Sequence, residues 1–249
     1  LTFAAHPDIA WDVAYSPDGT RQATVGADGT AKLWEAETGQ SIWSISPGDG
    51  LTSLAFNPDG RRLAVGSAAG MIALLDAATG QPVITLPGHT YVVFDLVFSP
   101  DGRQLLTSSW DGTAKLWELA SGRELLTFQG QWSGVAFHPN GKSLFTGGLD
   151  RYVHQWDAAT GQELQKYSDG SQDVYGVAIS PDGNLLAIGQ QDGALTLWEV
   201  KSGKLLRTLM GHAGLVARLA FSQDGSHLAS ASFDRLAKVW EVASGEELF

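Results

Sequence analysis

The tetrapeptide Ser16-Pro17-Asp18-Gly19 decides the fold, because close variants of it return along the whole chain. The variants lie at residues 57–60, 99–102, 138–141, 180–183 and 222–225. The turn glycines of successive copies are separated by 41, 42, 39, 42 and 42 residues. A period of this length, with nothing inserted between copies, indicates a repeat architecture in which each unit buries its apolar faces against its neighbours.

Each copy reads as four short strands joined by turns. An apolar run, such as residues 13–15, leads into the Pro-Asp-Gly turn, where proline presets its own φ and glycine relaxes the exit. A second run ends at Asp-Gly, as in Asp111-Gly112, which is a strong β-hairpin signal. The third run closes on tryptophan and an acid, as in Trp117-Glu118, and a Ser-Gly or Thr-Gly pair precedes the fourth. Four antiparallel strands per copy predict small twisted sheets that stack face to face.

With these features the whole chain resembles the WD40-repeat family. The family's Gly-His opening stands at Gly88-His89 and Gly211-His212, with Ala5-His6 a near match, and each histidine is followed 22 residues later by a turn aspartate. The resemblance implies one all-β domain over residues 1–249, a β-propeller of six four-stranded blades. Residues 244–249 align with 121–126 and residues 1–3 with 126–128, which favours a ring closed by an outer strand shared between the two termini. A fragment of a seven-bladed or longer array stays open as the alternative.

The resemblance also implies a buried tetrad of His, Ser or Thr, Asp and Trp within a blade. Complete sets are expected in two copies, as His89, Ser109, Asp111, Trp117 and as His212, Ser232, Asp234, Trp240. The first copy keeps His6, Asp28 and Trp34 but has Gly26 at the expected hydroxyl position. The second copy has Pro47, Ala69 and Leu75 at the tetrad positions, so apolar packing alone should hold that blade.

Composition excludes several classes of function. The chain has 27 acidic and 16 basic residues, a net charge of −11, and no basic run that could follow a phosphate backbone, so nucleic acid and anionic membranes are not expected partners. No apolar stretch approaches the roughly 18 residues of a membrane span, and no signal sequence is expected, since residue 1 onward shows no charged segment followed by an apolar one. Cysteine is absent, which excludes disulfides and thiol chemistry. A cytoplasmic location is the default expectation.

Motifs for catalysis are also missing. The six histidines show no metal-ligand spacing, and neither a Gly-x-Ser-x-Gly elbow nor a phosphate-binding glycine loop occurs. Residues 36–43 and 76–81 resemble the docking motif of quinoprotein propellers, but only Trp43 supplies its tryptophan, so a quinoprotein-like enzyme is a remote alternative. No catalytic residue, metal or cofactor is expected.

In WD40 propellers, the face that bears the second hairpin turn and the start of the innermost strand often binds peptides, so two positions per copy become candidates by resemblance. The position before the turn aspartate holds Ala27, Ala68, Trp110, Leu149, Gln191 and Phe233. The position five residues before the first residue of the Pro-Asp-Gly turn holds Trp11, Thr52, Phe94, Ser133, Tyr175 and Ala217. Exposed aromatic side chains are enriched in binding hot spots. The expected partner-binding residues are therefore Trp110, Phe233, Leu149, Gln191, Trp11, Phe94 and Tyr175. Alternatively, Trp11, Phe94 and Tyr175 only plug the narrow channel of a six-bladed ring.

These observations predict a non-catalytic scaffold that binds a protein or peptide on the channel face, either alone or as a domain of a larger signalling or regulatory protein. The second hypothesis is a structural or oligomerising repeat array. A monomer is expected, and a strand-exchanged oligomer is the alternative.

Overall fold

The computed structural model describes residues 5–148 and 150–249, and these residues form an all-β structure without helices. The strands assemble into six antiparallel sheets, each a β-propeller blade, which confirms the predicted fold class. The chain divides into two compact units, Leu1–Thr127 and Phe128–Phe249. The outer strand expected to be shared by the termini includes residues 1–3, which lie outside the described residues, so ring closure stays a prediction.

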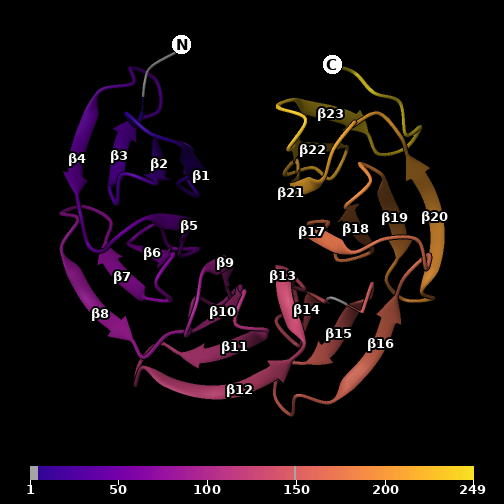
Figure 1. Cartoon of the computed structure of the whole chain (residues 1–249), viewed down its shortest axis with the longest axis horizontal. Coiled ribbons are helices and arrows are strands. Elements are labelled where there is room, and N and C mark those ends of the chain that lie inside the picture. Colours follow the sequence, from indigo (N-terminus) through magenta and orange to yellow (C-terminus); the bar gives the residue numbers. More distant parts are fainter. Residues whose placement is uncertain (1–4, 149) are drawn as a thin grey trace. The chain divides into compact units, whose positions relative to one another are not determined.

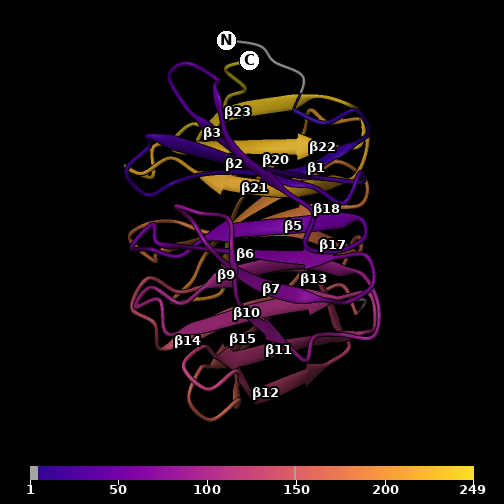
Figure 2. The same ribbon diagram turned by 90° about the vertical axis from the view of Figure 1, so that its left-hand side faces the viewer.

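Unit 1 contains three blades whose strands follow one another in sequence order. Blade 1 consists of β1 (Ala10–Tyr15), β2 (Arg21–Gly26), β3 (Ala31–Glu35) and β4 (Ser41–Ile45). Blade 2 consists of β5 (Leu51–Phe56), β6 (Arg62–Ser67), β7 (Ile72–Asp76) and β8 (Pro82–Leu86). Blade 3 consists of β9 (Val93–Phe98), β10 (Gln104–Ser109), β11 (Thr113–Glu118) and β12 (Arg123–Gln129). The first strands of the three blades, β1, β5 and β9, lie side by side, and the fourth strands lie at the opposite edge (Figure 1). Figure 2 shows the three blades stacked from β1 at the top to β12 at the bottom.

Unit 2 repeats this arrangement. Blade 4 consists of β13 (Gln131–Phe137), β14 (Ser143–Gly148), β15 (Val153–Asp157) and β16 (Glu163–Tyr167). Blade 5 consists of β17 (Val174–Ile179), β18 (Leu185–Gln190), β19 (Leu195–Glu199) and β20 (Lys204–Leu209). Blade 6 consists of β21 (Val216–Phe221), β22 (His227–Ser232) and β23 (Ala237–Glu241). Residues 246–249 run antiparallel to β23, since the amide of Val239 donates to the carbonyl of Phe249 at 2.8 Å and the amide of Leu248 donates to the carbonyl of Val239 at 2.8 Å.

The Pro-Asp-Gly turns behave as their composition predicts. In blade 1 the Ser16 hydroxyl donates to Asp18 at 2.6 Å and accepts the amide of Arg21 at 2.9 Å, while Gly19 has φ of 71°. Hydrogen bonds from Ser16 and Thr20 lower the pKa of Asp18 to about 2. The turn therefore closes on an ionised carboxylate and on a glycine in the left-handed region.

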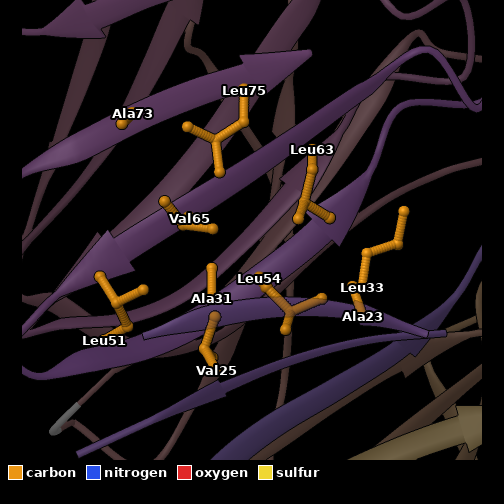
Figure 3. Packing of buried hydrophobic residues seen from close by; sticks show 10 residues of the cluster. All are labelled: Ala23, Val25, Ala31, Leu33, Leu51, Leu54, Leu63, Val65, Ala73 and Leu75. Carbon is orange, nitrogen blue, oxygen red and sulfur yellow. The ribbon is translucent and has the colours of Figure 1, made fainter. Parts of the chain in front are cut away.

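Apolar side chains hold each blade against the next. Blades 1 and 2 share a cluster in which side chains of β2 and β3 meet side chains of β5, β6 and β7 (Figure 3). Leu63, Val65 and Leu75 of blade 2 are fully buried in this cluster. Blade 2, which lacks the tetrad residues, is therefore packed through aliphatic side chains, as expected.

Within unit 1, blade 1 is the first of the three blades, so no preceding blade of that unit packs on β1. Val13 and Tyr15 on β1 are 53% and 61% exposed. The equivalent Leu54 of blade 2 and Leu96 of blade 3 are buried, because each packs on the blade that precedes it. Blade 1 thus presents an apolar sheet face of the kind that another blade covers elsewhere in unit 1.

Glycines in the hairpin between the second and third strands of a blade differ in how closely the backbone of another segment approaches them. Gly70 and Gly112 occupy the same turn position, with φ of 86° and 88°. A Cβ on Gly70 would lie 2.1 Å from the carbonyl oxygen of His89, whereas a Cβ on Gly112 would meet nothing within 4 Å. Both substitutions incur the left-handed strain, but only one adds a collision with the backbone.

We expect Gly70→Ala to lower the free energy of unfolding by about 1 to 3 kcal/mol more than Gly112→Ala, because the collision adds to the shared strain. Urea denaturation of both variants and the parent checks the difference. Equal losses would mean that the close approach of the two segments does not exist in solution.

Candidate partner-binding surface

A buried hydrogen-bonded chain joins four side chains of blade 3. Nδ1 of His89 lies 2.9 Å from Oδ2 of Asp111, and Nε2 of His89 lies 2.8 Å from the Thr107 hydroxyl. That hydroxyl also accepts the indole N–H of Trp117 at 2.9 Å. The network ties the hairpin turn, the loop before β9 and the two central strands together.

Blades 1 and 6 contain the same network. In blade 6 His212 bonds Asp234 and Ser230, each at 2.8 Å, and Trp240 donates to Ser230 at 2.9 Å. In blade 1 the corresponding set is His6, Asp28, Thr24 and Trp34, with polar contacts of 2.9 to 3.0 Å.

The hydroxyl of the tetrad was therefore predicted at the wrong position. Thr107 and Ser230 fill it, two residues before the expected Ser109 and Ser232. Residues two apart on a strand share a face, and the tryptophan indole reaches only the hydroxyl farther from the turn.

Ser109 has a different part in the turn. It donates to the carbonyl of Tyr91 at 3.0 Å and accepts the amide of Asp111 at 3.0 Å. Ser232 makes the equivalent bonds in blade 6. The same two-residue offset explains why the first copy seemed to lack a hydroxyl at Gly26, since Thr24 supplies it.

Burial and hydrogen bonding set the charges of the blade 3 tetrad. Burial lowers the pKa of His89, and the Asp111 carboxylate offsets only part of that effect. Burial works to raise the pKa of Asp111, but hydrogen bonds from the Thr113 hydroxyl, the Thr90 amide and His89 outweigh it, so the pKa lies below its ordinary value. A neutral histidine beside a carboxylate carries its proton on Nδ1. The polar atoms of the tetrad bond to one another within the blade, so the tetrad has a structural role.

Blade 4 replaces the histidine with a glutamine that sequence reasoning missed. The Thr146 hydroxyl donates to Oε1 of Gln131 at 2.8 Å and accepts the indole N–H of Trp156 at 2.8 Å. The copy is three residues shorter before β13, so Gln131 falls outside the spacing that locates the other histidines.

The first candidate position is fixed by a backbone hydrogen bond at the hairpin turn. The amide of Trp110 donates to the carbonyl of Val92 at 3.0 Å, and the amide of Phe233 donates to that of Leu215 at 2.9 Å. Ala27, Ala68 and Gln191 make the same bond in blades 1, 2 and 5. Each turn is thereby held next to the loop that opens its blade. We call this end of a blade the hairpin side.

The second candidate position coincides with a β-bulge in the first strand of five blades. The pairing of β9 with β10 passes from Asp95 directly to Val93, and that of β1 with β2 passes from Asp12 to Ala10. The skipped residues are Trp11, Thr52, Phe94, Tyr175 and Ala217. A β-bulge interrupts the regular alternation of side chains along a strand. In blade 3 the bulged Phe94 lies beside Trp110 of the hairpin turn, with the two ring centroids 6.3 Å apart.

In unit 1 the two positions meet and form an aromatic cluster, defined as Tyr91, Phe94 and Trp110. The Trp110 ring lies 6.3 Å from the Phe94 ring at an interplanar angle of 25° and 6.3 Å from the Tyr91 ring at 48°. Trp110 is 49% and Tyr91 54% exposed, while Phe94 is partly buried. Tyr91 was not predicted, because the equivalent positions in the other tetrad blades, Asp8 and Gly214, hold no aromatic residue. Trp11 of blade 1 is also exposed.

In unit 2 the candidates are more dispersed. The Tyr175 ring packs edge-on against Trp132 at 5.1 Å, and Tyr175 is partly buried. Phe233 is 66% exposed on blade 6, and Gln191 is exposed on blade 5. Leu149 lies outside the described residues. Partner binding by these residues stays a prediction.

Among residues 5–148 and 150–249, no helix is long and apolar enough to cross a membrane. The same residues contain no group of three or more histidine or acidic side chains arranged to hold a metal ion.

The tetrad makes a prediction about stability. Thr107→Val removes the hydrogen-bond partner of both His89 Nε2 and the Trp117 indole. Each buried group left without a partner costs about 1 to 3 kcal/mol, and partial relaxation of the site reduces the sum. We therefore expect the free energy of unfolding to fall by about 2 to 4 kcal/mol. Ser108→Ala is the matched control, because the buried Ser108 hydroxyl has no hydrogen-bond partner among the described residues. Chemical denaturation compares the two, and a control loss as large as that of Thr107→Val would contradict the network.

The family comparisons agree with this geometry. The model described as "WD domain, G-beta repeat" matches residues 1–35, 80–118, 122–157, 161–199 and 203–241. A second model, "Anaphase-promoting complex subunit 4 WD40 domain", matches residues 38–94 and so includes blade 2. No curated protein matches the chain. Since the first model alone covers more than half of the residues, the chain belongs to the WD40-repeat family.

Proposed function

We propose that this protein is a non-catalytic interaction scaffold that binds a protein or peptide on the hairpin side of its blades. WD40 domains generally act in this way. The observation that carries the proposal for this chain is the exposed aromatic cluster of blade 3, in which three rings gather at one turn.

The fold does not require large rings at these positions. Ala27 and Ala68 make the same backbone bond as Trp110 in the neighbouring blades, and Thr52 occupies the bulge that Phe94 occupies in blade 3. Aromatic side chains at sites where alanine or threonine suffices are best explained by contact with a partner, because rigid rings are favoured as interface anchors. Phe233 on blade 6 extends the same argument to unit 2.

Affinity capture from a source lysate tests the proposal with a Trp110→Ala, Phe233→Ala double variant. We expect the parent to enrich a specific protein and the variant to lose it, since alanine at a hot spot costs about 2 kcal/mol or more of binding free energy. The matched control is Ile42→Ala, Val83→Ala, which removes exposed apolar side chains from the outer strands β4 and β8. Cooperative unfolding of every variant is the condition for comparison. Capture of the same proteins by the parent and the aromatic variant would place binding elsewhere.

A structural or oligomerising array is the second candidate, and the observation behind it is the apolar face of β1, which no blade of unit 1 covers. Val13 and Tyr15 would be buried if another blade packed on them, as happens at Leu54 and Leu96. If the chain assembles through this face, its mass in sedimentation should rise with concentration, and Tyr15→Glu should abolish the rise by placing a charge in an apolar contact. A constant mass over the accessible concentrations rules out the array.

A further inference from the structure

The hairpin side of unit 1 is rich in aspartates. It comprises residues 5–12, 26–30, 46–52, 67–71, 87–95 and 109–113, and these contain no lysine or arginine. They contain the aspartates Asp8, Asp12, Asp28, Asp49, Asp95 and Asp111.

Several of these carboxylates are held in the ionised state. Hydrogen bonds from Thr30 and His6 outweigh burial and lower the pKa of Asp28, as happens at Asp111. Asp12 accepts the amide of Leu54 on the next blade at 3.0 Å. Asp8 and Asp49 are exposed, outside the tetrads. A surface with several carboxylates produces a negative potential that attracts cationic segments.

The nearest lysine ammonium groups already have partners within unit 1. Lys32 donates to the carbonyl of Ala5 at 2.6 Å, and Lys115 pairs with Glu124 at 2.5 Å on the outer strand. The five arginines of unit 1 lie elsewhere. Arg21, Arg61, Arg62 and Arg103 follow the Pro-Asp-Gly turns, at the opposite ends of the first strands, and Arg123 begins β12 after the turn that follows β11. In unit 1 the arginines therefore lie away from the hairpin side, on a side that carries carboxylates as well, such as Asp18 and Asp59.

The aromatic cluster lies on this acidic side. Tyr91, Phe94 and Trp110 offer ring faces, and two of the aspartates, Asp95 and Asp111, directly follow Phe94 and Trp110 in sequence. Aromatic faces attract ammonium and guanidinium groups, and tryptophan attracts them most strongly. The rings and the surrounding carboxylates favour the same class of ligand through two independent physical effects.

We propose that the hairpin side of unit 1 binds a basic segment of a partner protein, with a lysine or arginine side chain seated on the aromatic cluster. This proposal rests on the proposed scaffold function and names the chemistry of its partner. An acidic segment would be repelled by the same carboxylates, and nucleic acid is disfavoured for the same reason.

Fluorescence anisotropy tests the proposal with a labelled peptide of alternating lysine or arginine and serine, beside a matched peptide in which glutamate replaces each basic residue. We expect the basic peptide alone to bind, with an affinity that falls as salt is added. Trp110→Ala should weaken binding by about tenfold, which corresponds to about 1.4 kcal/mol and lies within the range of a cation–π contact.

Two charge variants test whether the basic peptide is attracted by the hairpin side in particular or by the negative charge of the whole protein. Asp8→Asn, Asp49→Asn should weaken the basic peptide by about threefold to tenfold and flatten its salt dependence, while Asp59→Asn, Glu37→Gln on the opposite side should have no such effect. Equal weakening by both pairs, or equal binding of the basic and acidic peptides, overturns the proposal.

The result is distinguishable from failure of the scaffold function. If the Trp110→Ala, Phe233→Ala variant loses its lysate partner but the basic peptide shows no preference, the scaffold stands and the basic partner is excluded. If the basic peptide binds as expected while lysate capture is unchanged in that variant, the charge preference stands and the scaffold site was wrongly assigned.

Discussion

The rest of the structure depends on the fact that a four-stranded blade has two apolar faces and cannot cover either one itself. In unit 1 the aliphatic side chains of β2 and β3 are buried only because blade 2 lies against them, and those of β6 and β7 because blade 3 does. Stability in such a stack belongs to the contacts between neighbours more than to any single blade. The near-constant repeat length follows, since an insertion within a strand would move its apolar side chains to the wrong face.

This dependence explains why the hydrogen-bonded tetrads can be incomplete. Blade 3 has all four members, blade 4 substitutes Gln131, and blade 2 has aliphatic side chains at the same places. A tetrad fixes the hairpin turn against the loop that opens the blade, but packing between blades holds the sheet in place. The network adds local precision to a structure that burial already supports.

The sequence predicted the blades well because turn residues and strand periodicity are local properties. Pro-Asp-Gly and Asp-Gly each favour a tight turn. Together with the Trp-acid pair, they recur where the strands begin and end. The hydroxyl of the tetrad was placed two residues late because Thr107 and Ser109 share a face and a chemistry, and only the reach of the Trp117 indole distinguishes them. Tyr91 was missed for a different reason: its equivalents Asp8 and Gly214 are not aromatic, so the repeat pattern gave no sign of a ring at this position. The candidate positions were taken from family resemblance. The structure shows that the second of them is a β-bulge, which no particular residue type predicts.

The bulge has a consequence for how such a chain can diversify. The same bulge forms with tryptophan, threonine, phenylalanine, tyrosine and alanine within one molecule. The register of the blade therefore does not depend on which of these residue types stands there. In each blade with such a bulge, a single mutation can change the side chain offered to a partner while the strands of the blade keep their pairing.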